Sequence, residues 1–312
     1  CVEKTPKSSL HNGITKVLSK TDGLKFACLN VRGLLVGSKL SEIDSLLHDC
    51  DFDVFGLCET FLDDNVPAHL YEIPGYDIVK KHRNRHGGGV LMYIKHGLKF
   101  TVLDDISTKS VESVWIKVKP SKGNPIAIGT MYRPPSATSQ YFTNMLDEIE
   151  QIYIKFDKFL LMGDLNFDYK LDEKLCDNSV HHIEILYNLK QLITSPTRVT
   201  EHSATTIDVI LSSDPMNHVR TGVYKIGMSD HYMPYTVYKC KKDVTSTHKT
   251  MSFRNYINFN VDEFKNDLSV RLTALNEIWS EDDFLMKWDT FLNDVIILQP
   301  LKLEMIGTGV MI

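Results

Sequence analysis

The chain has 312 residues, of which 43% are hydrophobic, and a formal net charge of -5. This length and composition allow one substantial core of roughly 200 to 250 residues with a smaller appendage. The acidic balance argues against a generic nucleic-acid binder, which is usually basic, but it leaves room for an enzyme with a local basic face. No run approaches the roughly 18 apolar residues of a membrane span, and the N-terminal residues do not read as a signal-peptide core, so we expect no membrane partner.

Four short apolar runs are predicted strands, and each ends at a polar residue. They are Leu24 to Asn30, which leads to Gly33; Val54 to Cys58, which delivers Glu59; Ile126 to Tyr132, which leads to Arg133; and Phe159 to Met162, which leads to Gly163-Asp164-Leu165-Asn166. Continuous apolar runs of this length are typical of strands that are buried on both faces. Four strand ends are therefore expected to present Asn, Glu, Tyr and Asp or Asn.

Two predicted helices, Gln140 to Tyr153 and Val180 to Leu189, alternate with these strands. This alternation favours a layered α/β arrangement. His181 and His182, at the start of the second helix, are expected to be surface or capping residues.

A further apolar run, Thr206 to Leu211, contains Asp208, and Ser229-Asp230-His231 precedes another predicted strand, Met233 to Tyr238. A carboxylate among apolar residues is costly unless it accepts good hydrogen bonds. We therefore expect Asp208 to pair with His231 across adjacent strands, which would raise the pKa of the imidazole.

These blocks together supply the parts that phosphodiester hydrolysis needs. The reaction requires a cation, a carboxylate that activates water, amide or phenol donors, and an imidazole near the phosphoryl oxygens. Each block alone has a simpler interpretation; Gly-Asp-Leu-Asn, for example, is an ordinary turn sequence. The joint order of the blocks, each after an apolar run, favours a phosphodiester-cutting metal site.

The ordered set resembles the endonuclease/exonuclease/phosphatase superfamily over Leu24 to Lys239. In detail it is most similar to the endonucleases of non-LTR retrotransposons, the LINE-type elements. The similar segments are Tyr132 with Arg133-Pro134-Pro135, Gly87-Gly88-Gly89-Val90 before Met92-Tyr93-Ile94, Pro196-Thr197-Arg198-Val199-Thr200, and Ile207-Asp208-Val209-Ile210. The resemblance implies a four-layer αββα sandwich of two packed mixed sheets, with the site at one end of the strands.

The resemblance also implies the metal and its ligands. Mg²⁺, or Mn²⁺ in its place, would be held mainly by Glu59, with Asn30 and Asp230 at or beside the metal. Because Mg²⁺ keeps most of its waters, one or two carboxylates suffice. No small-molecule cofactor is expected.

The catalytic roles follow from the same resemblance. Asp164 is implied to position and deprotonate the attacking water, Asn166 to fix its geometry, and Tyr132 to contact the phosphate. His231, held by Asp208, is implied to contact the scissile phosphate and, when protonated, to stabilise the transition state. DNA would be the substrate, with Arg83, Arg85, Arg133, Arg198 and Thr206 as the expected substrate-binding residues.

The residues around the glycine run have two interpretations. The basic run Lys80 to His86 is either a solvated loop or a contact to the phosphate backbone, and a DNA substrate favours the second. Gly87-Gly88-Gly89 lacks the following helix and the Lys-Ser/Thr of a nucleotide site, so it is predicted to be a hairpin turn.

The six cysteines show no Cys-x-x-Cys spacing, which argues against a zinc site. Cys28 and Cys58 lie in apolar runs and are expected to be small core residues rather than disulfide partners. These features indicate a reducing, intracellular compartment, and a retroelement nuclease would work in the nucleus.

The predicted domains are a poorly ordered segment over 1–22, the endonuclease/exonuclease/phosphatase domain over 23–240, a linker over 241–260 and a helical tail over 261–312. In the tail, Val261 to Leu272 and Asp283 to Leu298 have apolar residues at helical spacing. Ser252 to Tyr256 resembles the linker that precedes the reverse transcriptase of those elements. We interpret the tail as the truncated start of that region, with the polymerase in cis in the full element.

The leading hypothesis is thus a Mg²⁺-dependent DNA endonuclease that leaves a 3′-hydroxyl and a 5′-phosphate. Within the same superfamily, a phosphatase or phosphodiesterase acting on inositol phosphates or a phospholipid, or an enzyme for abasic DNA, is the alternative. A retroelement remnant that binds DNA without cutting it is the alternative outside enzymes.

Overall fold

The predicted apolar runs form the central strands of the protein. The structure, a computed structural model, describes residues 11–170 and 179–240, together with residues 262, 265, 266 and 269. Strands β1 (Leu24–Asn30), β2 (Val54–Cys58) and β7 (Ile126–Tyr132) have the predicted bounds, and all of their residues are buried. This burial on both faces explains why the runs are continuously apolar.

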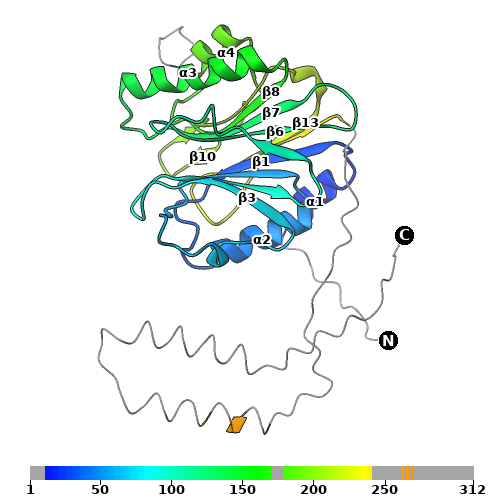
Figure 1. Cartoon of the computed structure of the whole chain (residues 1–312), viewed down its shortest axis with the longest axis vertical. Helices are drawn as coiled ribbons and strands as arrows, with labels where there is room; N and C mark the ends of the chain where they lie inside the picture. Colours follow the sequence, from blue (N-terminus) through cyan, green and yellow to red (C-terminus); the bar gives the residue numbers. More distant parts are fainter. Residues whose placement is uncertain (1–10, 171–178, 241–261, 263–264, 267–268, 270–312) are drawn as a thin grey trace. The chain divides into compact units, whose positions relative to one another are not determined.

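Two six-stranded sheets contain these strands (Figure 1). The first has the order β13-β14-β1-β2-β4-β3, and the second the order β5-β6-β7-β8-β12-β9. Besides β1, β2 and β7, the strands are β3 (Tyr76–Lys81), β4 (Val90–Lys95), β5 (Phe100–Val102), β6 (Glu112–Val118), β8 (Phe159–Asp164), β9 (Lys190–Gln191), β12 (Asp208–Ser212), β13 (His218–Tyr224) and β14 (Met233–Tyr238). A separate two-stranded ribbon joins β10 (Arg198–Val199) to β11 (Ala204–Thr205).

The sheets are mixed, and their central neighbours are parallel. β1 runs parallel to β2, which places Asn30 opposite Cys58, and β7 runs parallel to β8, which places Tyr132 opposite Asp164. β12 is antiparallel to β8 and places Asp208 opposite Asp164. The carboxyl ends of β1, β2, β7 and β8 thus come with the start of β12 to the same edge.

Helices cover the outer faces of the two sheets, so the predicted four-layer αββα sandwich is confirmed (Figure 1). α1 (Asn12–Leu18) and α2 (Lys39–Cys50) share one apolar core with the first sheet, and α3 (Ser139–Lys155) and α4 (Val180–Tyr187) share another with the second. Two short 3-10 turns, Ala68–Leu70 and Pro215–Asn217, lie in the connections. Side chains of both sheets fill the middle core.

A glycine sets how closely the sheets approach. A Cβ at Gly56 of β2 would lie 2.3 Å from Oγ1 of Thr130 on β7 in the other sheet. Only a residue without a side chain fits at that point. The predicted core cysteines belong to this middle layer: Cys28 and Cys58 are buried and free, and their thiols donate to the carbonyls of Val209 and Met131.

Some predictions differ from the structure at the ends of the domain. Helix α1 lies within the segment 1–22 that was predicted to be poorly ordered, and it buries Ile14 and Leu18 against the first core. This segment is too short for the apolar spacing of a helix to stand out. Residues 1–10 and the cysteines Cys1 and Cys176 lie outside the described residues.

The structure describes few of the residues on which the C-terminal predictions were made. The chain divides into a unit that ends at Thr247 and a second that begins at His248. The predicted linker over 241–260 and nearly all of the tail over 261–312 lie outside the described residues. In the part that is described, no helix has the length and apolarity that crossing a membrane requires.

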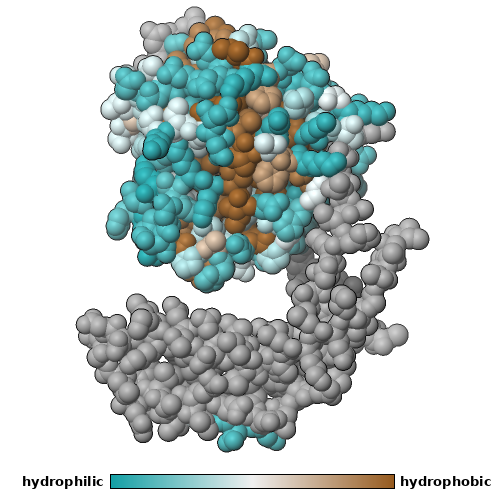
Figure 2. All heavy atoms as spheres, viewed as in Figure 1, coloured by the Kyte–Doolittle hydropathy of each residue, from teal (hydrophilic) through white to brown (hydrophobic). Residues whose placement is uncertain are grey.

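Figure 2 shows a mostly hydrophilic face with a strip of hydrophobic side chains between the helical layers.

Two smaller predictions concern local elements. The glycine run closes the β3–β4 hairpin, as predicted, with a bridge between Asn84 and Gly87. Ser179, rather than either histidine, caps α4 by accepting from the backbone N–H of His182. His181 is half-buried and is held between Glu184 and the carbonyl of Tyr169.

Candidate active site

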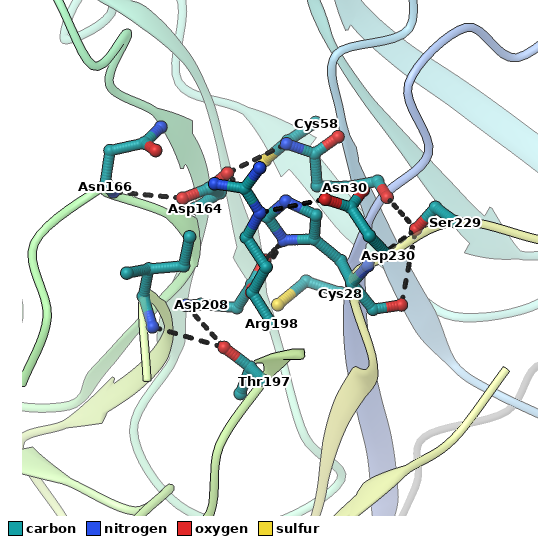
Figure 3. A network of polar contacts seen from close by, with 12 residues as sticks. Cys28, Asn30, Cys58, Asp164, Asn166, Thr197, Arg198, Asp208, Ser229 and Asp230 are labelled. Carbon is teal, nitrogen blue, oxygen red and sulfur yellow. Dashed lines mark hydrogen bonds and ion pairs between the residues drawn. The ribbon is translucent and has the colours of Figure 1, made fainter. Parts of the chain in front are cut away.

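Asp164 lies at the centre of a polar network at the edge where the strands end (Figure 3). It is the last residue of β8 and is 1% exposed. Its Oδ2 accepts a 2.8 Å hydrogen bond from Nδ2 of Asn30 at the end of β1, and its Oδ1 accepts one of 2.9 Å from the backbone N–H of Asn166. Burial and the neighbouring Asp208 raise the pKa of Asp164 to about 7. The carboxyl therefore changes its charge near neutral pH, which suits a general base.

The backbone on either side of Asp164 has special geometry. Gly163 has a φ of +141°, and a Cβ there would lie 2.0 Å from the carbonyl oxygen of Met131. Asn166 has a φ of +51°, in the left-handed region that Asn tolerates better than most residues. Its side-chain amide donates to the carbonyl of Arg133 at 2.8 Å, which ties the end of β8 to the end of β7.

Asp208 and His231 form the predicted pair, but they do so between the two sheets rather than across adjacent strands. Asp208 starts β12 in the second sheet, whereas His231 precedes β14 in the first. Nδ1 of His231 donates to Oδ2 of Asp208 at 2.9 Å and lies 4.0 Å from Oδ2 of Asp164. Both side chains are almost completely buried. Because Nδ1 faces the carboxylates, Nε2 is the nitrogen left for chemistry.

At His231, the neighbouring carboxylates together have a larger effect on the pKa than burial has. Burial lowers the pKa of His231, but Asp208, with help from Asp164, raises it, and the net direction is upward. Thr197 supports the pair, since its Oγ1 accepts from the backbone N–H of Asp208 at 3.0 Å. Ser229 ties the preceding loop to β1 by donating to the carbonyl of Asn30. The site thus holds an imidazole that is biased towards its charged form.

Glu59 and Tyr132 form a second pair at the same edge. Glu59 is half-buried and has a φ of +54°, and its carbonyl accepts from the backbone N–H of Gly33. The hydroxyl of Tyr132 donates to Oε1 of Glu59 at 2.8 Å. Burial and the Glu59 charge raise the pKa of Tyr132 far above its usual value, so the phenol stays protonated and remains a donor.

Asp230 is held by two arginines. Its Oδ1 accepts from Nη1 of Arg32 and its Oδ2 from Nε of Arg198, both at 2.9 Å. These bonds outweigh partial burial and lower the pKa of Asp230 to about 2. Arg32 was not among the predicted site residues, although it lies two positions after Asn30 in the same block. Its φ of +47° at a strand end is the local feature that places it here, and sequence spacing does not reveal it.

Residues 27–231 match the Endonuclease/Exonuclease/phosphatase family. The chain belongs to this family. It is a superfamily of phosphodiester hydrolases, nucleases and phosphatases, whose members generally depend on a divalent metal. No curated protein matches the sequence.

Solved structures of the family share the fold. The chain is similar to the AP endonuclease LMAP from Leishmania major, with 16% identity, a TM-score of 0.60, and coverage of 71% of this chain and 90% of that one. It is also similar to the endonuclease domain of TRAS1, a telomere-specific non-LTR retrotransposon, with 15% identity, a TM-score of 0.54, and coverage of 70% and 100%. A third is a variant of the 3′ phosphatase NExo from Neisseria bound to a product DNA hairpin, with 16% identity, a TM-score of 0.51, and coverage of 69% and 99%. At these identities the likeness shows the fold alone.

The donor chemistry of the family site fits a hard divalent cation. Glu59 offers a carboxylate that, among the described residues, accepts only the Tyr132 hydroxyl, through one of its two oxygens. Asp164, Asp208 and His231 also lie close enough together to hold a metal. In that cluster, however, Nδ1 of His231 already donates to Asp208, which indicates a proton-sharing group. Glu59 is therefore the better placed metal ligand, while its role stays a prediction.

The predicted substrate-binding residues lie in different surroundings. Arg133 lies with its guanidinium 4.0 Å from the centre of the Phe167 ring, and it donates weakly to the carbonyls of Leu165 and Ala137. Thr206 is completely buried, and its hydroxyl has no partner among the described residues. In this structure both support the loops that hold Asp164, and contact with a substrate stays a prediction for them.

The basic hairpin loop between β3 and β4 reaches the site through one arginine. Nη1 of Arg83 donates to Glu112 at 2.7 Å, and the guanidinium lies 6.0 Å from the centre of the Tyr132 ring. Arg85 is exposed at the tip of the hairpin. Contact of this loop with the DNA backbone stays a prediction.

Proposed function

We propose that the protein is a Mg²⁺-dependent DNA endonuclease that nicks one strand and leaves a 3′-hydroxyl and a 5′-phosphate. The observation that carries the proposal is the contact of Asn30 and Asp164 beside the Asp208–His231 pair. Asp164, Asn30 and His231 come from three separate parts of the chain, and their surroundings raise the pKa of both Asp164 and His231. A purely structural role would not require a buried carboxyl next to a second buried carboxyl.

Each residue of the site has a separate role in hydrolysis. Asp164, fixed by Asn30 and Asn166, accepts the proton of the attacking water. His231, charged through its contact with Asp208, donates a hydrogen bond from Nε2 to a phosphoryl oxygen as negative charge builds up. Tyr132 keeps Glu59 in place and offers its phenol next to the phosphate.

Glu59, with Asn30 beside it, would hold Mg²⁺, and Mn²⁺ would serve the same site. The bound cation supplies charge neutralisation at the phosphate and the leaving oxygen.

DNA as the substrate is supported by the local basic groups and by the motifs shared with retrotransposon endonucleases. Arg32, Arg83, Arg85 and Arg198 lie at least partly exposed on a chain whose net charge is negative. A local basic face of this kind matches a polyanion. We propose that the chain derives from a non-LTR retrotransposon whose reverse transcriptase lies in cis, with the segment 261–312 leading towards it, and that it acts in the nucleus.

The test is conversion of supercoiled plasmid to the open-circular form with Mg²⁺ or with EDTA. We expect nicking that requires Mg²⁺, is lost in Glu59→Gln and persists in the exposed control Glu72→Gln. If the folded protein leaves the plasmid supercoiled, the proposal is wrong. Release of phosphate from inositol phosphates would then identify a phosphatase, and retention of DNA without either reaction an idle remnant.

A further inference from the structure

The contact of Asp230 with two arginines is not explained by the roles assigned above. The carboxylate gives one oxygen to each guanidinium, at 2.9 Å in both cases. Arg32 comes from the loop after β1, and Arg198 comes from the β10–β11 ribbon. Three distant segments of the chain thus place two positive charges around one negative charge beside His231.

The backbone holds both arginines in register with the catalytic groups. The N–H of Arg32 donates to Oδ1 of Asn30, and the carbonyl of Arg32 accepts from Nζ of Lys39 at 2.8 Å. Arg198 forms a β-bridge with His231, and the N–H that follows it, on Val199, donates to the carbonyl of Asp230. The backbone of each arginine is therefore tied to a residue close to Asp164, namely Asn30 or His231.

The arrangement is poorly suited to a metal at Asp230. A divalent cation there would meet two guanidinium charges at short range, and the repulsion would offset the attraction of the single carboxylate. Both carboxylate oxygens already accept charge-assisted bonds. This geometry disagrees with the role beside the metal that the sequence resemblance implied for Asp230.

The same arrangement is well suited to an anion. The side chains of Arg32 and Arg198 are 51% and 38% exposed, and each uses one of its five N–H donors on Asp230. Among the described residues, neither guanidinium makes a further hydrogen bond, so its remaining donors are available to a ligand. A planar guanidinium matches the oxygens of a phosphate, and preorganised donors lose less entropy when they bind it.

We propose that Arg32 and Arg198 form a subsite for a DNA phosphate that neighbours the scissile one, with Asp230 as the anchor of the pair and not a metal ligand. The inference rests on the proposed endonuclease function. Asp230 is then a positioning residue, because it acts through the two arginines. The subsite places the backbone of the nicked strand so that the next phosphate lies against Asp164 and His231.

The first experiment measures DNA binding in EDTA, without metal. Fluorescence anisotropy with a labelled duplex is followed over a range of salt concentrations for the wild type, Arg32→Gln, Arg198→Gln and the double variant. Each single variant is expected to weaken binding several-fold and to reduce the slope of log K against log salt by about 0.9, the value for one lost phosphate contact. Arg220→Gln, an exposed arginine near the opposite end of the first sheet, is the matched control and should leave the slope unchanged.

The second experiment measures Mn²⁺ binding to the protein without DNA, by calorimetry. Asp230→Asn is expected to change the affinity by less than about threefold, whereas Glu59→Gln should weaken it by about tenfold or more, as loss of a direct ligand does. Thermal unfolding of every variant shows that it is folded. An Asp230→Asn loss as large as that of Glu59→Gln, or wild-type salt slopes in both arginine variants, would overturn the inference.

The two proposals fail in different ways. A wild type that does not nick plasmid refutes the endonuclease, whatever the arginine variants do. A wild type that nicks, combined with unchanged DNA binding in the double arginine variant, refutes the phosphate subsite alone.

Discussion

Asn30 and Asp164 belong to different sheets, and a 2.8 Å hydrogen bond from Nδ2 to Oδ2 joins them across 134 positions of the chain. The bond connects the two sheets at the edge where the strands end, because Asn30 is the last residue of β1 and Asp164 is the last residue of β8. Together with the bond from the backbone N–H of Asn166 to Oδ1, it fixes the orientation of the Asp164 carboxylate. One amide therefore connects the packing of the sheets to the orientation of the candidate base.

Removing that amide should lower activity more than stability. For Asn30→Ala we expect a loss of about 10- to 100-fold in nicking rate, which is typical when a group that orients a catalytic residue is removed. The matched control is Asn124→Ala, which deletes an exposed Asn–Asp hydrogen bond to Asp157 and should leave the rate unchanged. Equal rates in wild type and Asn30→Ala would show that Asp164 needs no such support.

The strands of this site were predictable because each is a continuous apolar run with a polar residue at its end. The bounds of β1, β2 and β7 agree with the prediction to the residue, and a buried carboxylate in an apolar run correctly implied the Asp208–His231 contact. Which sheet each strand joins was not predictable, because pairing depends on distant parts of the chain. For that reason the pair was expected across adjacent strands and is found between sheets.

Arg32 shows the same limit for side chains. Its position next to Asp230 depends on a left-handed turn and on a salt bridge over 198 positions, neither of which leaves a pattern in the sequence. For Arg133 and Thr206 the motif positions suggested substrate contact, which stays a prediction, while the structure adds that Arg133 packs on Phe167 and that Thr206 is buried. Motifs identify residues near a site, and the fold decides which atoms face it.

The raised pKa of Asp164 predicts opposite effects of pH on activity and stability. The base must be ionised, so the acid limb of the pH–rate profile should lie near pH 7, where the pKa of Asp164 is about 7. The folded state favours the protonated carboxyl, so ionisation costs stability, which falls as pH rises from the ordinary value of 3.8 through about 7.

Asp164→Asn separates the two effects. The variant should be inactive, and its melting temperature should exceed that of the wild type at about pH 8 but not at about pH 4, because it has no charge to bury. Asp157→Asn, at an exposed carboxylate, should show no such pH-dependent gain. A wild-type melting temperature above that of Asp164→Asn at the higher pH would mean that the ionised carboxyl stabilises the fold.

Asp208→Asn should lower the pKa of His231. With the carboxylate gone, burial still lowers the pKa of the imidazole and only Asp164 and Asp230 raise it, so the pKa should fall from its raised value. Stability from the charged imidazole is present below that ordinary value and is lost as pH rises through the raised pKa of the folded state. The variant should therefore lose more stability in acid than in alkali, and its activity should decline at lower pH than that of the wild type. NMR titration of His231 measures the shift directly, and an unchanged titration would contradict the charge pairing.

Tyr132→Phe should slow nicking by about tenfold, the effect expected for about 1.4 kcal/mol of lost orientation at Glu59. The hydroxyl that is removed donates to Oε1 of Glu59. Tyr238→Phe provides a matched control, because Tyr238 donates in the same way to Asp214 near the opposite end of the strands. Steady-state nicking at saturating Mg²⁺ compares the two. A similar loss in both variants would indicate a general effect on the fold rather than a specific role at Glu59.

Gly163→Ala should destabilise the protein, because the residue before Asp164 has a φ of +141° and its Cβ would lie 2.0 Å from the carbonyl oxygen of Met131. The strand β7 would have to move away from β8, which parts Tyr132 from Asp164. We expect a loss of more than about 1 kcal/mol in the free energy of unfolding, measured by urea denaturation. In Gly13→Ala, by contrast, the new methyl group meets nothing within 4 Å on helix α1, and the variant should gain up to about 1 kcal/mol. If Gly163→Ala unfolds at the wild-type midpoint, the close approach of β8 to β7 at this residue is not what fixes the position of Asp164.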